Sequence, residues 1–332
     1  MLRTRRELEE GATALGVRAD VLERVGRLVE VLWRVDAREG LADHYALKGG
    51  TALNLFWLPL PRFSVDVDVN FVGEVEHAHL AAVRQEFIRG VVQCCQLAGC
   101  RVLHTPGEHA GGKLRLRFPS AFGGTQNLEA DVSFVARVPL HGLVRRRGAI
   151  AEFAEREVST YTLPELSAGK FAALLSRSVP RDRYDAARLV ELEPNLPDDA
   201  SFRLAFTCQA ASARRDCRGW SAPLAPLAAR DVQQALLPVL RRAPGASATD
   251  ARALAEGLDR DLAPAVEQVL AWRADERAFL DALMERGEIH PEFLTDDLAL
   301  QRRIAAQPML RWKRIHVRRQ KGLPAFDEEA DA

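Results

Sequence analysis

The chain has 332 residues, 47% of them apolar, and its 46 lysines and arginines balance 46 aspartates and glutamates. This composition is typical of globular proteins and excludes disordered and fibrous chains, and at about 150 residues per domain the length predicts two domains. The sequence lacks both a run of about 18 apolar residues and the apolar stretch of a secretory signal, so we expect a cytoplasmic protein without a membrane span. The five cysteines, an odd number, predict reduced thiols rather than disulfides.

The first 71 residues predict helices followed by one half-buried strand. Residues 1–40 place apolar side chains at three- and four-residue spacing, which predicts helix. Residues 51–58 are apolar enough for one or two buried helical turns before Pro59 and Pro61 end them. In residues 64–71 the period changes to two, which predicts a strand. Its apolar face carries Val65, Val67, Val69 and Phe71, and its polar face carries Ser64, Asp66, Asp68 and Asn70.

Two more alternating segments follow a helix that we expect over about residues 75–97. Residues 113–118 alternate leucine and phenylalanine with lysine and arginine, and residues 127–134 alternate apolar residues with polar and acidic ones. Because each strand has one apolar and one polar face, we expect a small sheet with helices packed on one side and a polar cleft on the other. From residue 162 onward the pattern is almost entirely helical.

The acidic residues of the strands are the strongest candidates for a functional site. Asp66 and Asp68 share one strand face with roughly 7 Å between their Cα atoms. Partly enclosed, two such carboxylates are stable only if one is protonated or a cation lies between them, and Mg²⁺ prefers hard oxygen ligands of this kind. The alternative is an exposed acidic strand. Strand pairing would add Asp131, and three carboxylates can hold two metal ions for a phosphoryl displacement. Glu129 lies on the same face and competes with Asp131 for this position.

A glycine pair, Gly49 and Gly50, precedes the short helical stretch. Bare backbone at such a point can approach a phosphate, and the N-terminus of a helix offers its N–H groups. The alternative is a tight turn between a strand and a helix. The order of glycine pair, short helix and acidic strand favours the phosphate site.

The start of the helical half carries a third cluster of polar residues. Thr162 and Glu165 have the spacing of a capping box, so we expect a helix from residue 163 that presents Lys170 two turns in. A second helix opens around Asp182 and Asp185, which lie at positions i and i+3. The alternative for these two is local, with Asp182 as an N-cap and Asp185 complementing the helix dipole.

Together these segments resemble the AbiEii/AbiGii toxin family of nucleotidyltransferase-fold proteins. The matching stretches are LKGGTALNLF, the R-x-S-x-D-x-D pattern of residues 62–68, and K-x-x-x-L-x-x-R-x-x-x-R-D-x-x-D over residues 170–185. The similarity spans about residues 44–192. It implies an α+β fold: a nucleotidyltransferase-like small mixed sheet with flanking helices in residues 1–158, followed by a helical domain in residues 159–332.

The resemblance also implies transfer of a nucleoside monophosphate from an NTP to an acceptor. Relatives act as toxins that modify the 3′ acceptor ends of tRNA and are restrained by a cognate antitoxin. The implied site residues divide by role: Asp66 and Asp68 bind Mg²⁺; Gly49, Gly50 and Ser64 contact phosphate; Lys170 offsets nucleotide charge; and Asp182 or Asp185 orients that lysine or the acceptor. Asp131 is assigned as the third metal ligand from the strand alternation alone.

A basic segment near the C-terminus suits an RNA acceptor. Residues 299–326 contain eight lysines and arginines, no acidic residue, and Trp312 and His316 among them, so the segment can neutralise phosphates and stack a base. The alternative is a solvated basic helix. The arginines at 145–147 form a second, shorter patch. Three other functions remain open: a small-molecule nucleotidyltransferase of the antibiotic-modifying kind, a kinase-like action on a partner protein, and an inactive binding module with the same fold.

Overall fold

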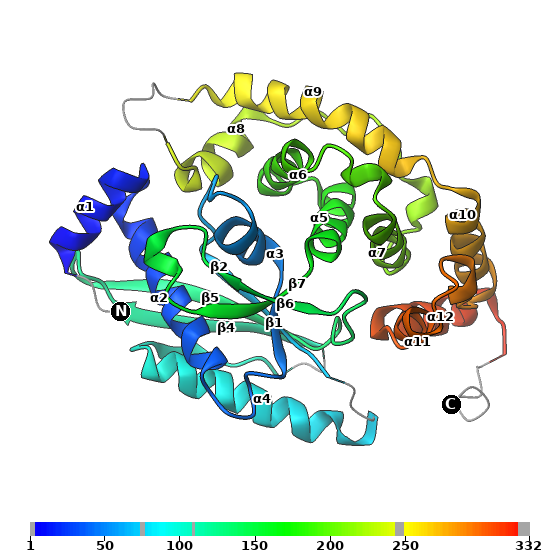
Figure 1. Ribbon diagram of the computed structural model, residues 1–332, viewed down its shortest axis with the longest axis horizontal. Helices are drawn as coiled ribbons and strands as arrows, with labels where there is room; N and C mark the ends of the chain where they lie inside the picture. Colours follow the sequence, from blue (N-terminus) through cyan, green and yellow to red (C-terminus); the bar gives the residue numbers. More distant parts are fainter. Residues whose placement is uncertain (1–3, 74–76, 108–109, 243–248, 325–332) are drawn as a thin grey trace.

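A mixed seven-stranded sheet forms the centre of the molecule (Figure 1). The structure is a computed structural model that describes residues 4–73, 77–107, 110–242 and 249–324. Its strand order is β3-β4-β5-β2-β1-β7-β6, with β2 parallel to β5, β1 parallel to β7, and all other neighbours antiparallel. The strands are β1 (Tyr45–Leu47), β2 (Asp66–Phe71), β3 (Arg101–His104), β4 (Gly111–Pro119), β5 (Thr125–Ser133), β6 (Leu143–Arg147) and β7 (Glu157–Tyr161). The expected α+β class with a mixed sheet is confirmed.

The helices fall into two groups along the chain. Those around the sheet strands are α1 (Arg5–Leu15), α2 (Ala19–Asp36), α3 (Gly49–Ala52), which continues through a π-helical turn over Leu53–Trp57, and α4 (His77–Leu97). Those of the second half are α5 (Leu163–Arg177), α6 (Pro180–Leu192), α7 (Ala200–Ala211), α8 (Ala229–Asp231), α9 (Ala251–Leu270), α10 (Ala274–Asp281), α11 (Leu298–Ala305) and α12 (Pro308–Lys321). The described part of the second half is thus helical from Leu163, as its pattern predicts.

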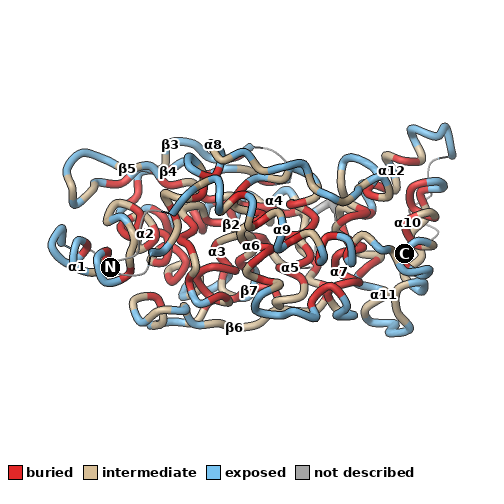
Figure 2. Tube along the Cα trace, turned by 90° about the horizontal axis from the view of Figure 1, so that it is seen from above, coloured by how far each residue is buried: buried red, intermediate tan, exposed pale blue. Residues whose placement is uncertain are grey.

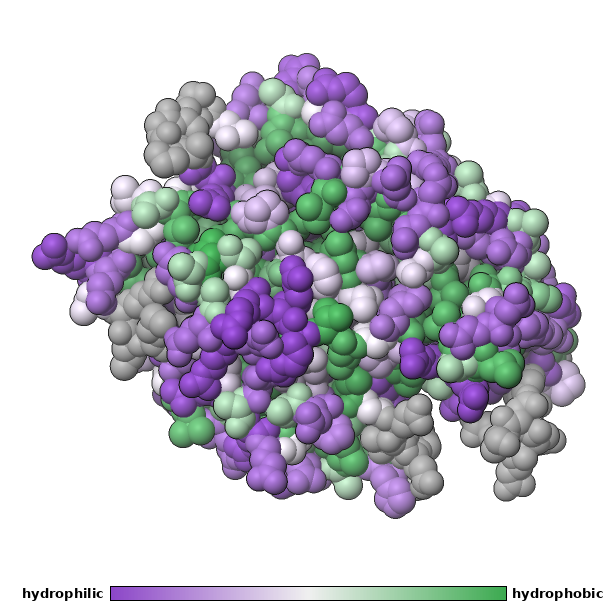
Figure 3. Space-filling view, in the orientation of Figure 1, coloured by the Kyte–Doolittle hydropathy of each residue, from purple (hydrophilic) through white to green (hydrophobic). Residues whose placement is uncertain are grey.

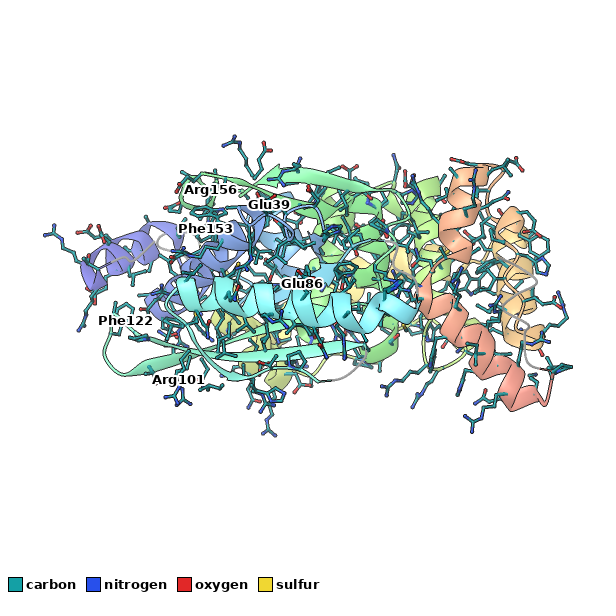
Figure 4. All side chains as sticks on the ribbon, turned by 90° about the horizontal axis from the view of Figure 1, so that it is seen from below. Glu39, Glu86, Arg101, Phe122, Phe153 and Arg156 are labelled. Atoms are coloured by element: carbon teal, nitrogen blue, oxygen red, sulfur yellow. The ribbon has the colours of Figure 1, made fainter. Side chains whose placement is uncertain are left out.

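One face of the sheet packs against α4 and α2. The apolar side of β2 ends in Phe71, whose ring contacts Phe87 of α4 edge-on and stacks against Phe134 after β5. Figure 4 looks onto this face and shows α4, which carries Glu86, crossing in front of the strands. The alternation in β2 and β5 therefore has the expected result: the apolar residues face these helices, and the acidic residues lie on the opposite face of the sheet.

The opposite face of the sheet lies under α3, α5 and α6 (Figure 1). One contiguous cluster of buried apolar side chains extends from the helices before the sheet to those of the second half. Figure 2 shows buried segments concentrated around β2, α3, α5 and α7. The proposed division between residues 158 and 159 falls inside β7, so the sheet itself extends to Tyr161. All five cysteines are buried and free.

Several local expectations differ from the structure. The helix expected over residues 1–40 is two helices, because Gly16 adopts a left-handed conformation (φ 65°) that ends α1. The capping box is wrong: Thr162 is the N-cap of α5 without a side-chain bond, and buried Glu165 accepts backbone hydrogen bonds from Leu140 and His141 instead. The start of the helix expected at about residue 75 lies outside the described residues.

The basic patch expected at residues 145–147 lies on β6, and its three arginines have partners within the protein. Arg145 pairs with Asp36 at 2.6 Å, Arg147 lies 3.5 Å from Glu157, and Arg146 stacks over the ring of Trp57. Figure 3 shows hydrophilic residues gathered around this edge of the sheet. Charged residues on an edge strand discourage pairing with another chain. In the described parts of the chain, every helix is too short or too polar to cross a membrane.

Candidate active site

The candidate site is built on the polar faces of two parallel neighbours, β2 and β5. Their register places Asp68 directly beside Asp131 and Asp66 beside Glu129. The two candidates for the third carboxylate differ in their partners. Glu129 is bound by Lys113 at 2.6 Å and lies 3.9 Å from Arg115, whereas no cationic side chain among the described residues forms an ion pair with Asp131. Asp131 is therefore the carboxylate that remains available next to Asp68.

The electrostatics of this group favour a bound cation. Burial, together with the charges of Asp131 and Asp66, raises the pKa of Asp68 above its ordinary value, although Lys48 and Lys170 act in the opposite direction. Asp66 is more open and lies 3.6 Å from Arg181. Over the described ranges, no three acidic, histidine or cysteine side chains already stand in a metal-binding arrangement. The oxygen donors of Asp66, Asp68 and Asp131 nevertheless fit Mg²⁺, since a divalent cation would relieve their mutual repulsion.

The two glycines bring the backbone of α3 against the acidic strand. A Cβ atom on Gly49, whose φ is +65°, would lie 2.1 Å from Oδ2 of Asp68. On Gly50 it would lie 2.7 Å from Nη2 of Arg62 and 3.2 Å from Oγ of Ser64. Side chains at these two positions would fill the space between the helix and the strand. The glycine pair thus lets the backbone at the start of α3 lie directly against the Asp68 carboxylate, the Ser64 hydroxyl and Arg62.

A second group of charges lies beside the carboxylates, and we call it the lysine cluster: Arg62, Lys170, Arg177, Asp182 and Asp185. Nζ of Lys170 lies 2.9 Å from a carboxylate oxygen of Asp182 and 2.9 Å from one of Asp185. Arg62 donates to both oxygens of Asp185, at 2.7 and 2.6 Å, and Arg177 donates to both oxygens of Asp182, at 2.7 and 3.2 Å. Three cations meet two carboxylates, so the cluster keeps one positive charge.

The pairing fixes the charge of each buried member of the lysine cluster. Burial by itself would lower the pKa of Lys170, but Asp185 and Asp182 outweigh it and raise that pKa. Burial would raise the pKa of Asp185, but Arg62 and Lys170 hold it far below its ordinary value. Both groups are therefore charged at neutral pH. Asp185 is fully buried and positions the two cations, and Asn54 donates to it as well. Val179 is the N-cap of α6, so the alternative role of Asp182 as N-cap is wrong.

Two hollows meet at the carboxylates. The Ser64 hollow, about 620 Å³, is lined by the sheet, the start of α6 and the residues after α8, and includes Gly50, Ser64, Lys113 and Arg181. The α12 hollow, about 470 Å³, is lined by β2, α5, α7 and the start of α12. Four residues line both hollows: Asp68, Asp131, Lys170 and Arg177. Both volumes lie within the usual range of small-molecule sites, about 300–1,000 Å³.

The basic C-terminal segment contains side chains of two kinds. Lys313 is buried and donates to the carbonyl of Ala213, and Lys321 pairs with Glu285 at 3.0 Å, so these two attach α12 to the protein. Trp312 is 46% exposed, and its ring stacks on that of His316 with 5.1 Å between centroids. The segment is thus partly structural, and an exposed aromatic pair remains on its surface.

The structure adds site residues to which sequence analysis gives no role. Arg62 and Arg177 lie inside the motifs that match the family, so their positions in those motifs could have identified them as site residues. Lys48, just before the glycine pair, lines the α12 hollow and acts electrostatically on Asp68. Asn54 has no such signal, because its contact with Asp185 joins residues 131 positions apart.

A pair of acidic strands on a mixed sheet, packed against a helix that begins with two glycines and followed by a helical second half, defines a nucleotidyltransferase-type protein. The family model for the nucleotidyl transferase AbiEii toxin of type IV toxin–antitoxin systems matches residues 30–328, and the chain belongs to this family. Among solved structures, MenT4, a nucleotidyltransferase toxin from Mycobacterium tuberculosis H37Rv, is similar in fold. Its TM-score is 0.55 at 18% identity, over 92% of this chain and 99% of that chain. None of the curated proteins matches this chain.

Proposed function

We propose that this toxin transfers a nucleoside monophosphate from an NTP to the 3′ end of an RNA, specifically a tRNA, and that a cognate antitoxin restrains it. The observation that supports this proposal most is the excess of negative charge where the two hollows meet. Three carboxylates with too few cations lie next to the glycine pair at the start of α3, and this combination suits a metal-bound triphosphate. The reaction takes place in the cytoplasm, where NTP and tRNA occur together.

In this proposal the triphosphate lies in the Ser64 hollow. The backbone of Gly50 and the hydroxyl of Ser64 donate hydrogen bonds to phosphate oxygens, and Lys113 and Arg181 offset their charge. Asp66, Asp68 and Asp131 hold Mg²⁺, which supplies charge stabilisation to the transferring phosphoryl group when it is bound. Lys170 adds the residual positive charge of its cluster and is kept in place by Asp182 and Asp185.

The two halves of the chain divide the work in this proposal. Residues 1–158 hold the nucleotide and metal, and residues 159–332 supply Lys170 and a wall of the second hollow. Lys170 lines both hollows, so it lies where the two halves meet. The basic helix α12 with its exposed aromatic pair suits an RNA acceptor rather than a small antibiotic, because a small molecule has no need of an extended basic surface.

The test is incubation of the protein with each labelled NTP, Mg²⁺ or EDTA, and three acceptors: total tRNA, tRNA with an oxidised 3′ end, and an aminoglycoside. We expect label only in intact tRNA and only with the metal. Asp68→Asn is the inactive control. Label in the aminoglycoside would favour the small-molecule enzyme, and label in oxidised tRNA would contradict the 3′ end as the acceptor. Growth arrest on expression, relieved by Asp68→Asn and by the antitoxin, tests the toxin–antitoxin relation.

A further inference from the structure

The polar face of β2 runs beneath both hollows. Ser64, just before the strand, and Asp66 line the Ser64 hollow, Asp68 lines both, and Asn70 lines the α12 hollow. Residues two apart on a strand lie about 7 Å apart along one face. The carboxylates therefore lie where the two hollows meet, and a phosphate held there through a metal ion would be accessible from both.

Phosphoryl transfer sets which group lies on which side. The entering oxygen and the leaving oxygen lie roughly in line through the phosphorus atom. The reaction forms a bond between the acceptor oxygen and the α-phosphorus, breaks the bond to the oxygen that bridges to the β-phosphorus, releases pyrophosphate, and loses the hydroxyl proton to solvent. If the leaving pyrophosphate lies in the Ser64 hollow, the acceptor hydroxyl enters from the α12 hollow.

Small and apolar side chains line part of the α12 hollow. On α5 these are Gly169, Ala173 and Ser176, and on α12 they are Met309 and Leu310. A Cβ atom on Gly169 would meet no atom of the described residues within 4 Å, so there is open space beside this position of α5.

The same hollow contains a buried hydrogen-bond acceptor without a partner. Asn70 is fully buried, and its amide nitrogen donates to the hydroxyl of Tyr161 at 2.9 Å. Its Oδ1 atom has no hydrogen-bond partner among the residues that the structure describes. Buried polar groups in folded proteins are nearly always satisfied, so a lone acceptor in a hollow indicates a ligand that donates an N–H or O–H.

Two arginines flank the lining residues of this hollow. Arg137 follows the lining pair Val135 and Ala136, and Arg311 follows the lining pair Met309 and Leu310. Burial and the charge of Arg311 lower the pKa of Arg137, which indicates that the two cations repel. Each donates to a backbone carbonyl, and within the described residues neither forms an ion pair with a carboxylate. Two arginines in this state suit a phosphate.

We propose that the α12 hollow receives the 3′-terminal nucleoside of the acceptor RNA, with Oδ1 of Asn70 accepting a hydrogen bond from it and Arg137 and Arg311 binding the phosphate before it. The assignment depends on the proposed transfer to RNA and adds where the acceptor end lies. The nucleoside of the NTP then lies outside this hollow, beside the α-phosphate.

The first test fills the hollow with Gly169→Met. Methionine has a higher helix propensity than glycine, so α5 should remain folded. Gly257→Met on α9 is the matched control, since that glycine is also helical and has space around it. The probe is a tRNA that ends in a 3′-deoxynucleotide, which binds but cannot be extended. We expect Gly169→Met to weaken its affinity and to slow transfer at least tenfold, with the affinity for Mg²⁺ and NTP within twofold of wild type.

The second test removes the proposed phosphate-binding side chains with the double variant Arg137→Ala/Arg311→Ala. The slope of log affinity against log salt for the same RNA should flatten by about 0.7 for each phosphate that the protein no longer neutralises. Arg6→Ala is the charge control, because Arg6 is exposed and pairs with Glu10 on α1, at the opposite end of the molecule from α12 (Figure 1). It should leave the slope unchanged.

The outcomes separate this assignment from the function on which it depends. If Gly169→Met lowers NTP affinity and leaves RNA affinity intact, the hollow holds the nucleoside of the NTP, and the assignment is wrong. Wild-type affinity for both ligands would also overturn it while transfer to RNA stands. If the wild-type protein labels no RNA under any condition, the proposed function fails and the acceptor site with it.

Discussion

Two groups of charge lie side by side in this protein and are organised in opposite ways. The carboxylates Asp66, Asp68 and Asp131 have too few cations, and burial and mutual repulsion raise the pKa of Asp68. In the lysine cluster every buried charge has an opposite partner within 2.9 Å. The first arrangement is costly without a ligand, whereas the second satisfies itself.

The difference shows what each group does for the protein. Asp185 connects Arg62, just before β2, with Lys170 of α5, and it lies on α6 itself. The lysine cluster thus attaches the helices of the second half to the sheet and sets the position of Lys170. Among the three carboxylates, Asp66 has one long ion pair, with Arg181 of α6 at 3.6 Å, and the negative charge that remains is available to a metal-bound substrate. Removing one charge from each group should therefore have opposite effects on stability.

The largest expected loss of stability comes from Asp185→Asn. This change leaves Arg62 and Lys170 buried with too little negative charge, and removal of one partner of a buried ion pair costs about 3–5 kcal/mol. Chemical denaturation measures the free energy of unfolding. Glu9→Gln is the control, because its pair with Arg5 is exposed and should be worth no more than about 0.5 kcal/mol. Equal effects of the two variants would show that the lysine cluster is not structural.

Asp68→Asn should abolish most of the activity and should not destabilise the fold. Removal of a metal ligand takes away several kcal/mol of transition-state stabilisation, so we expect transfer to fall on the order of a thousandfold. Without metal the variant should be as stable as wild type or more stable, because repulsion from Asp131 and Asp66 is relieved. Initial rates and thermal melts in EDTA check both statements. Near-normal activity at saturating Mg²⁺, or a strongly destabilised variant, would contradict the assignment.

Glu165 is a buried carboxyl outside both groups of charge, and it accepts hydrogen bonds from two backbone N–H groups. Burial raises its pKa to about 7 from 4.5. A raised carboxyl pKa gives stability that is fully present below pH 4.5 and is lost as the pH rises through about 7, a change of about 3 kcal/mol. Glu165→Gln has no such titration. The difference in unfolding free energy between the variant and wild type should therefore grow in favour of the variant from pH 4.5 to pH 8; a constant difference would show that the pKa is ordinary.

The smallest expected effect is that of Glu129→Gln, and it distinguishes Glu129 from Asp131, the other acidic residue of β5. Glu129→Gln breaks an exposed pair with Lys113, so it should change stability by less than about 1 kcal/mol and activity by less than about threefold. Asp131→Asn removes a carboxylate beside Asp68 that has no ion pair within the described ranges, so it should reduce Mg²⁺-dependent transfer as Asp68→Asn does. Titration of activity with Mg²⁺ in both variants makes the comparison. The reverse order of effects would assign the third ligand to Glu129.

The sequence by itself determined the elements that carry the site. Alternation over residues 64–71 and 127–134 placed every acidic residue on a polar strand face, because the side-chain period of a strand is a local property. The glycine pair and the helix with Lys170 followed from spacing in the same way. The capping box of Thr162 and Glu165 failed, because backbone donors 24 and 25 residues away take the carboxylate of Glu165.

Only the tertiary structure decided which charges are free. Asp131 and Glu129 are equivalent in the alternating pattern. The register with β4 places Lys113 opposite Asp131 and Arg115 opposite Glu129, yet the Lys113 side chain reaches diagonally and pairs with Glu129. Arg62 and Asp185 meet across 123 residues, and Lys313 of the basic segment turns inward to a carbonyl of residue 213. Periodicity fixes the face on which a side chain lies, but its partner depends on which distant segments fold against that face. The charge left for chemistry is what remains after those contacts form.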